Sequence, residues 1–323
     1  MASSHGNPHM PSETEFEQAL NQRVDQIFDA CVACGKCVEI CPMTDAAQVD
    51  KNDSEQVAKG ILNILREGEG DAAARRWADS CSLSGHCIPA CDYGVNPRFM
   101  LSMARVALAK KSKDVPERRR NGVRAFGALS RNVKVLSRIQ LQEDSLARLG
   151  QLKGDFGDDV EKDVSDVTEQ PDKPDVLFYT GCNVLKTPHI ALLGLDIFDA
   201  LGKTSKVVAG PTHCCGVLQH RAGDMQLSGR MGMSTIEKFM GVDAREVVSW
   251  CPSCQRQFGE ITLPTIEQAT GESLFEMTPY LVFLEKHRDE LGRLFRNPVN
   301  KRVALLRHTG AEGNLQAALN LLA

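Results

Sequence analysis

The sequence predicts an α+β protein of several domains, in which a helical part precedes an α/β part. In the first third of the chain, apolar residues recur at helical spacing over 13–30, 54–67 and 97–108, and two cysteine-rich loops separate these segments. From residue 175 onward, short apolar runs alternate with helical patterns, which is typical of a layered α/β domain with a largely parallel sheet. Each of these runs leads into cysteines, which therefore guide the functional interpretation.

Composition excludes several classes of protein. The 323 residues carry a net charge of −4 and only 5% aromatic residues, so nucleic acid is not an expected partner. No apolar run reaches the ~20 residues that a membrane-spanning helix needs, and residues 1–10 lack the features of a secretory signal. The C-x2-C spacings among the 12 cysteines favour metal sites in a reducing compartment. We therefore expect a cytoplasmic protein, with peripheral contact at the inner membrane left open.

The first cysteine loop has the spacing of a bacterial-type iron–sulfur motif. Cys31, Cys34 and Cys37 recur at every third position, and Cys41 with Pro42 follows. In this motif the first three thiolates bind one cluster, and the fourth binds the other cluster of the pair. Cys41 therefore predicts a second set of cysteines farther along the chain.

The second set repeats this motif with one cysteine missing, because Ser84 stands where a cysteine is expected. The pairing rule assigns one [4Fe-4S] cluster to Cys31, Cys34, Cys37 and Cys91, and a site with three thiolates to Cys41, Cys81 and Cys87. We expect that site to hold a [3Fe-4S] cluster, or a [4Fe-4S] cluster with Ser84 or water on its fourth iron. A loop hydroxyl that bonds the backbone is the simpler role for Ser84.

Residues 20–110 resemble the helical dicluster ferredoxin domain of succinate dehydrogenase iron–sulfur subunits and of the heterodisulfide reductase C-type subunit. The second cysteine set is most similar to the three-iron motif of succinate dehydrogenase. Five residues separate its first two cysteines, and the segment Gly94-Val-Asn96-Pro97 follows it. The resemblance implies that helices, rather than a sheet, hold both clusters.

The sign of the charge reverses between the two parts of the chain. Residues 110–138 carry ten basic and two acidic residues, whereas residues 155–175 carry nine acidic and two basic residues. Such a reversal indicates an interdomain region. A solvated surface is the simpler role for both runs, and the docking of an acidic partner or an anionic lipid surface on the basic run is the alternative.

Three strands are expected in the second part, and each ends next to cysteines. The strands are predicted at Val176–Tyr179, Lys206–Ala209 and Glu246–Trp250. The cysteines that follow them are Cys182, then Cys214 and Cys215, then Cys251 and Cys254. Because the carboxyl ends of parallel strands meet at one edge of a sheet, these five thiols are expected to gather there.

Five thiolates exceed the four that a cubane [4Fe-4S] cluster needs. The adjacent Cys214 and Cys215 cannot both be ordinary terminal ligands without strain, and one thiolate that bridges two irons would resolve this. The alternative is a zinc ion bound by four of the five cysteines, which leaves the fifth without a use.

This part closely resembles the cysteine-rich CCG domain of the heterodisulfide reductase B-type subunit. The resemblance implies a noncubane [4Fe-4S] cluster on the five cysteines, of the kind that cleaves a disulfide in that enzyme. His213 and His220 flank the cysteine pair and are candidate catalytic residues that could give a proton to a leaving thiolate. A polar loop residue bonded to the backbone is the simpler role for each.

The order of the two parts matches fused members of this superfamily. These are the heterodisulfide reductase D-type subunit, the glycolate oxidase iron–sulfur subunit and the C-type subunit of anaerobic glycerol-3-phosphate dehydrogenase. The family has two CCG repeats, and Arg302–Leu306 is the strand expected to start the second, although no cysteine follows it. Either the sequence stops early or that repeat is degenerate. The expected divisions are a disordered tail (1–20), a helical ferredoxin domain (21–110), a charged interdomain region (111–174), a CCG domain (175–300) and an incomplete second repeat (301–323).

The resemblance implies an electron-transfer subunit. No convincing phosphate-binding glycine loop is found, so a partner flavoprotein dehydrogenase is expected to supply electrons from an organic substrate. The acceptor would be a quinone or another carrier. The alternative function is reduction of a disulfide or heterodisulfide at the CCG-domain cluster.

Overall fold

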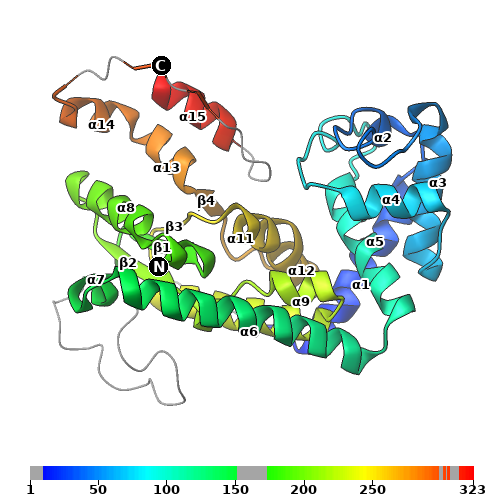
Figure 1. Ribbon diagram of the computed structural model, residues 1–323, viewed down its shortest axis with the longest axis horizontal. Helices are drawn as coiled ribbons and strands as arrows, with labels where there is room; N and C mark the ends of the chain where they lie inside the picture. Colours follow the sequence, from blue (N-terminus) through cyan, green and yellow to red (C-terminus); the bar gives the residue numbers. More distant parts are fainter. Residues whose placement is uncertain (1–9, 151–172, 298–300, 303, 306–312) are drawn as a thin grey trace, which may run out of the picture.

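The computed structural model describes residues 10–150, 173–297, 301–302, 304–305 and 313–323. Figure 1 shows a helical part, in blue and cyan, beside a second part in which helices surround a small sheet. The long helix α6 (Val115–Gln140) leaves the helical part and runs along the second part. The arrangement confirms the predicted fold class, a helical domain followed by an α/β domain.

The helical part is built from five α-helices and one 3-10 turn before α6, and its described residues form no strand. These elements are α1 (Glu13–Ala30), α2 (Lys36–Glu39), η1 (Lys51–Asp53), α3 (Ser54–Glu67), α4 (Ala72–Ser80) and α5 (Pro97–Ser112). The helices predicted over 13–30, 54–67 and 97–108 are confirmed. Asn96 caps α5 by accepting a hydrogen bond from the Phe99 amide, and Pro97 occupies the first turn, where its missing N–H costs nothing.

The prediction of a disordered tail over 1–20 is wrong for its last residues, because α1 begins at Glu13. Ser12 and Glu15 form a reciprocal capping box that satisfies the first amides of the helix. Phe16 and Leu20 are 2% and 1% exposed. Phe16 packs in the core of the α/β part, whereas Leu20 packs in the core of the helical part. This helix therefore joins the two cores.

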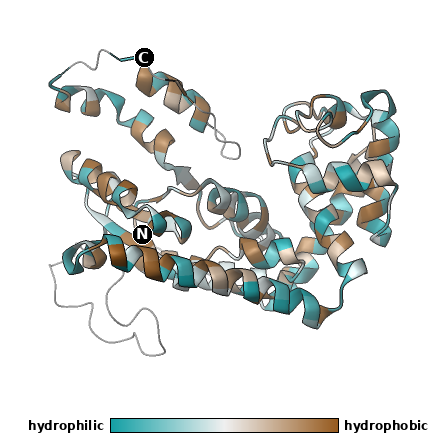
Figure 2. Cartoon of the chain, viewed as in Figure 1, coloured by the Kyte–Doolittle hydropathy of each residue, from teal (hydrophilic) through white to brown (hydrophobic). Residues whose placement is uncertain are grey.

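The described part of the predicted interdomain region is mostly helical. Asp114 caps α6, and the short helix α7 (Glu143–Arg148) follows it. Gly122 of α6 lies next to Gln219 and Ala222 of α9, so α6 packs closely on the second part. Figure 2 shows hydrophilic and hydrophobic residues along the length of α6. Most of the acidic run at 155–175 lies outside the described residues.

The sheet has four parallel strands in the order β2-β1-β3-β4. The strands are β1 (Val176–Gly181), β2 (Ser205–Ala209), β3 (Glu246–Ser249) and β4 (Met277–Pro279). The first three were predicted, and the structure confirms them. The fourth was not predicted, because it has only three residues and ends in a proline, which a sheet tolerates at its edge.

Helices cover both faces of this sheet. They are α8 (Pro188–Ala200), α9 (Val217–Ala222), α10 (Met225–Val242), α11 (Pro252–Arg256), the π-helix η4 (Gln257–Thr262), α12 (Leu263–Thr270), α13 (Tyr280–Lys286) and α14 (Arg288–Leu294), with 3-10 turns η2 (Asn183–Lys186) and η3 (Pro211–His213). Neighbouring residues of β1 point into two different cores. Phe178 packs with Phe198 and Tyr280, whereas Tyr179 packs with Phe239 and Phe258.

The strand predicted at Arg302–Leu306 falls partly outside the described residues, and Arg302, Ala304 and Leu305 are not in a strand. The helical pattern at the end of the chain is confirmed by α15 (Asn314–Leu322). Within the described parts of the chain, no helix combines the length and the apolar character needed to cross a membrane.

The two parts meet at an interface in which α1 contacts α10 and α12, and α5 contacts α9. Arg23 of α1 donates hydrogen bonds to the carbonyl oxygens of Glu260 and Ile261, at 2.8 and 3.1 Å. The buried Ser102 of α5 bonds the Nε2 of His220 of α9 at 2.8 Å. Direct polar contacts therefore fix how the two parts are oriented.

We expect Phe198→Ala to lower the free energy of unfolding by about 3–5 kcal/mol, because it leaves a cavity in the core. The Phe198 ring is fully buried and lies 5.1 Å from the ring of Phe178 and 5.2 Å from that of Phe283. Leu193→Ala in the same helix is the control, since Leu193 is 60% exposed. Its effect should stay within about 0.5 kcal/mol. Urea denaturation followed by circular dichroism measures both, and equal effects would contradict the core assignment.

Stability is expected to fall below neutral pH because of His220. Burial and nearby arginines lower the pKa of His220 from 6.5 to about 3. The unfolded chain therefore takes up a proton near pH 6.5, and the folded chain does so only near pH 3. The neutral His220 therefore contributes its full share of the unfolding free energy above pH 6.5, and this share is lost as the pH falls toward 3. Between pH 7 and pH 5 the unfolding free energy should fall by about 2 kcal/mol.

The variant His220→Gln tests this prediction, since an amide can still bond Ser102 but does not titrate. The unfolding free energy of the wild-type protein and of the variant is measured at pH 7 and at pH 5, which gives the slope of stability against pH for each. The variant should have the smaller slope, and identical slopes would exclude His220 as the source.

Candidate metal centres

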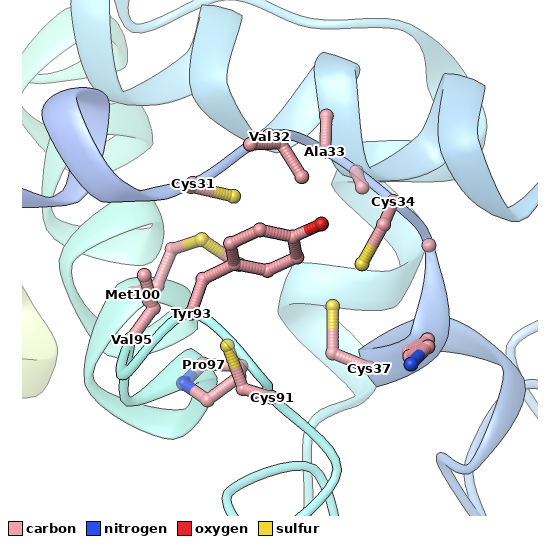
Figure 3. Close-up of a pocket in the computed structure, with 13 residues that line it drawn as sticks. Cys31, Val32, Ala33, Cys34, Cys37, Cys91, Tyr93, Val95, Pro97 and Met100 are labelled. Atoms are coloured by element: carbon pink, nitrogen blue, oxygen red, sulfur yellow. The ribbon is translucent and has the colours of Figure 1, made fainter.

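Four of the predicted cluster ligands line one pocket. Its wall includes Cys31, Cys34, Cys37 and Cys91, and Figure 3 shows their sulfur atoms directed toward a shared space. The ring of Tyr93, which is 48% exposed, lies at the same pocket. Cys91 comes from the second cysteine loop, so the structure brings together the set that the pairing rule assigned to the first cluster.

The two cysteine loops repeat the same backbone conformation. Ala33 and Gly35 have φ angles of 55° and 79° in the first loop, and Leu83 and Gly85 have φ angles of 62° and 78° in the second. The left-handed region suits glycine and is uncommon for other residues. Ser84 therefore occupies the structural position of Cys34.

An amide hydrogen bond to sulfur is also repeated. The Leu83 amide donates to the Sγ of Cys81 at 3.4 Å. A bond from the Ala33 amide lowers the pKa of Cys31, although burial raises it more. Amides that point at sulfur are a common way to stabilise cluster ligands. Both loops are therefore built to present thiolates.

The second set in the helical part contains Cys41, Cys81 and Cys87. Burial raises the pKa of Cys87, and the charges of Cys81 and Cys41 raise it further, as expected for sulfur atoms that lie near one another. The Cys87 thiolate likewise acts on Cys37 of the first set. Arg105 holds the second loop in place, because its Nη2 donates to the carbonyl oxygens of Asp79 and Cys81 at 2.9 and 2.7 Å. The two sets are therefore neighbours.

The five cysteines of the α/β part follow three adjacent strands. Cys182 comes after β1, Cys214 and Cys215 come after β2, and Cys251 and Cys254 come after β3. Hydrogen bonds between thiols link Cys182 to Cys214, Cys214 to Cys215, Cys215 to Cys254, and Cys254 to Cys251. The expectation that they gather at one sheet edge is thus met by a continuous group of sulfur atoms.

Gly181 makes room for this group. Its φ is +72°, and a Cβ at that position would lie only 3.1 Å from the Sγ of Cys254 and from the Cβ of Cys251. A larger residue would therefore be strained by its backbone and would also crowd the sulfur atoms.

Protonation differs across the five thiols. Hydrogen bonds from Cys214 and Cys254 lower the pKa of Cys215 to about 5, and one from Cys254 lowers the pKa of Cys251 to about 7. The pKa of Cys182 is raised by its hydrogen bond to Cys214 and by burial. The group therefore favours the thiolate at Cys215 and Cys251 more than at Cys182, and thiolate is the form that binds metal.

The thiols of the helical part need a cation to become charged. Burial raises the pKa of Cys37 and of Cys87 to about 12. A bound metal reverses this preference because ligation requires the thiolate. Among the described residues, no three His, Cys, Asp or Glu side chains meet the spacing for one metal ion. The donor sets, made of cysteine with paired amides, fit iron–sulfur clusters.

The predicted catalytic histidines lie in different surroundings. The carbonyl oxygen of His213 accepts a hydrogen bond from the Tyr179 hydroxyl at 2.8 Å, and burial lowers the pKa of the His213 imidazole. His220 is 2% exposed and bonds Ser102 across the interface. Their role as proton donors stays a prediction, and the contacts of His220 point to a structural role.

Sequence reasoning missed the arginines that surround the second and third cysteine sets. Arg98 and Arg256 are 5% and 4% exposed, and Arg98 forms a buried ion pair with Glu260. These residues follow no motif spacing, and arginine is ordinarily a surface residue. Only the packing of the two parts reveals them.

Two family descriptions match the chain. Residues 30–96 match a 4Fe-4S dicluster domain, and residues 176–259 match a cysteine-rich domain. All 12 cysteines lie within these two segments. No solved structure matches the chain.

Two curated proteins are similar to this chain. The D-type subunit of the dihydromethanophenazine:CoB–CoM heterodisulfide reductase of Methanosarcina barkeri is 23% identical over 312 residues, covering 88% of this chain and 70% of that protein. A ferredoxin of Moorella thermoacetica is 36% identical over 58 residues, covering 18% of this chain and 81% of that protein. The first similarity extends over both parts of the fold. The chain thus carries a 4Fe-4S dicluster domain followed by a cysteine-rich CCG domain, and over both of them it is similar to a heterodisulfide reductase D-type subunit.

Proposed function

We propose that this iron–sulfur subunit relays electrons between a flavoprotein dehydrogenase and a quinone or another carrier. The observation that carries the proposal is the row formed by the three cysteine sets. Cys37 of the first set is close enough to the second set for the charge of Cys87 to act on it. Across the interface, Arg98 donates to the carbonyl oxygen of Leu83 in the second cysteine loop and to Glu260, which lies in η4 six residues after Cys254 of the third set. A row of redox centres is what a relay needs.

Each set would hold its own cluster. A [4Fe-4S] cluster fits Cys31, Cys34, Cys37 and Cys91, and a [3Fe-4S] or [4Fe-4S] cluster fits Cys41, Cys81 and Cys87. A noncubane [4Fe-4S] cluster fits Cys182, Cys214, Cys215, Cys251 and Cys254, with zinc as the alternative. When bound, the clusters supply one-electron transfer, so a two-electron donor would be oxidised in two successive steps.

The chain's own residues shape the entry to this row. Val32 and Tyr93 are 57% and 48% exposed, and both line the pocket of the first set. An apolar rim of this kind allows a redox partner to approach closely. The partner would be a flavoprotein subunit, and the complex would be cytoplasmic with peripheral contact at the inner membrane.

A specific observation favours a second function, disulfide reduction at the third set. Hydrogen bonds hold the pKa of Cys215 and Cys251 below that of an ordinary thiol. A thiol with a lowered pKa is more often present as the thiolate, which is the form that reacts with disulfides. The reaction would consume two electrons and two protons for each disulfide and give two thiols. The relative from Methanosarcina barkeri carries heterodisulfide reductase in its name.

The occupant of the second set is tested by Ser84→Cys. Because Ser84 has the loop position of Cys34, the new thiol completes four ligands. We expect a three-iron signal in the oxidised wild-type protein, measured by electron paramagnetic resonance, to disappear in the variant. Ser82→Cys adds a thiol to the same loop at a different position and should leave the signal unchanged. A wild-type protein that lacks the signal would contradict the three-iron assignment.

The two functions are separated by Cys215→Ala. Anaerobic protein is supplied with reduced viologen, and the acceptor is either a water-soluble quinone or oxidised glutathione. If the relay ends at the dicluster domain, quinone reduction survives in the variant while any disulfide reduction is lost. Cys34→Ala is the control, because it removes a ligand of the first set and should slow both reactions.

Failure of the wild-type protein to reduce any quinone, combined with rapid disulfide reduction, would overturn the relay as the main function. A preparation free of iron and sulfide with full activity would overturn both functions.

A further inference from the structure

Arg98 is a buried cation that contacts the second cysteine loop directly. It is the second residue of α5 and is 5% exposed, and its Nη1 donates to the carbonyl oxygen of Leu83 at 3.3 Å. The same nitrogen packs on Gly85, since a Cβ built there would lie 2.7 Å from it. The guanidinium therefore lies against the residues on both sides of Ser84, the position at which this motif lacks its cysteine.

The backbone of this loop needs support. Leu83 has a φ angle of 62°, in the left-handed region that residues with a side chain rarely adopt. Such a conformation persists only where its surroundings hold it. Both polar backbone groups of Leu83 are held, because its amide donates to the Sγ of Cys81 at 3.4 Å and its carbonyl oxygen accepts from Arg98. Arg98 thus helps to keep this turn in place.

The first cysteine loop has the same backbone conformation but a different support. Its glycine, Gly35, packs on the side chain of Ser54 and on the backbone of Glu55 at the start of α3. Cys34 precedes that glycine, so a bound cluster would tie the loop through its thiolate. In the second loop Ser84 offers no thiolate, and a guanidinium supports the backbone.

Arg98 is itself fixed by the α/β part of the chain. Its Nε donates to the Oε1 of Glu260 in η4 at 2.8 Å, and its Nη2 donates to the same oxygen. Asn96, which caps α5, also donates to that oxygen, at 3.2 Å. The side chains of Arg98 and Glu260 are only 6% and 12% exposed, so the two charges are paired away from water. Two nitrogens of the guanidinium therefore anchor it to Glu260, and the third reaches the cysteine loop.

We propose that Arg98 is a positioning residue for the second cluster. Anchored by Glu260 across the interface, it holds Leu83–Gly85, and Ser84 with them, in the conformation of a cluster-binding loop that lacks its fourth thiolate. The inference rests on the second cysteine set holding a cluster, as in the proposed function. A guanidinium suits this role because its rigid fork bonds two partners in fixed directions. The α/β part thereby supports a cluster that it does not bind.

The test follows the electron paramagnetic resonance signal of each cluster while the anaerobically purified, cluster-loaded protein releases iron to a chelator. The signals of the first and second clusters are assigned by their loss in Cys34→Ala and in Cys87→Ala. The main variant is Arg98→Gln. The glutamine Nε2 takes the place of the arginine Nε beside Glu260 but leaves no donor to reach Leu83.

We expect the second cluster to release its iron about tenfold faster in Arg98→Gln, as the loss of one hydrogen bond from a charged group implies. The first cluster should release iron at the wild-type rate and serves as an internal reference. Wild-type release from the second cluster, or equal acceleration at both clusters, would overturn the proposal.

Arg23→Met is the matched control for the interface. Arg23 also binds η4, through the carbonyl oxygens of Glu260 and Ile261, and its guanidinium lies 4.3 Å from the centre of the Phe99 ring. This variant weakens the interface without touching Arg98, so iron release from the second cluster should stay close to the wild-type rate. If Arg23→Met accelerates it as much as Arg98→Gln does, the effect belongs to the interface as a whole and the proposal is wrong.

A fourth thiolate provides a second control. In Ser84→Cys the cluster itself ties the loop, so adding Arg98→Gln to this variant should accelerate iron release much less than it does in the wild-type background. A rescue of this kind supports loop positioning, because a general loss of stability would not be corrected by a new cluster ligand. An undiminished effect of Arg98→Gln would contradict it.

If Arg98→Gln does not retain its clusters, Arg98→Lys replaces it, since lysine keeps the charge beside Glu260 but has no fork to bond both partners. Faster release from the second cluster alone would support the role of the guanidinium, and wild-type release would overturn it. The readout needs no electron donor or acceptor. A wild-type protein that passes no electrons to quinone would refute the proposed relay, whereas unchanged iron release in the variants would refute only the positioning role.

Discussion

The structure depends on bringing thiols from distant segments together without leaving them as unpaired buried charges. Cys31 and Cys91 line the same pocket although α3 and α4 lie between them in the sequence. Three strands bring five more thiols to one edge of the sheet. Burial alone favours the neutral form, as the raised pKa of Cys37 and Cys87 illustrates. Folding therefore supplies position, and the metal supplies the charge balance. Folding and metal binding are therefore linked, because the loops position the thiolates and the metal balances their negative charge.

The interface between the two parts determines how these sets lie relative to one another. Arg23 donates hydrogen bonds to backbone carbonyl oxygens of η4, and the ion pair of Arg98 with Glu260 is buried in the same region. A buried ion pair contributes little net stability on average, because desolvation offsets most of the attraction. Its directional hydrogen bonds nonetheless restrict orientation. The contribution of this interface therefore lies in its geometry, which orients the loop of the second cysteine set relative to the α/β part.

The sequence allowed the strands next to cysteines to be predicted because short apolar runs with turn signals are local patterns. It also allowed the cysteines to be grouped, because the spacing of Cys31 to Cys41 carries a pairing rule. Strand β4 was missed because three residues ending in Pro279 carry no periodicity. Arg98 and its partner Glu260 were missed for another reason. Their importance comes from residues far away in the chain, and no local pattern encodes a contact across an interface.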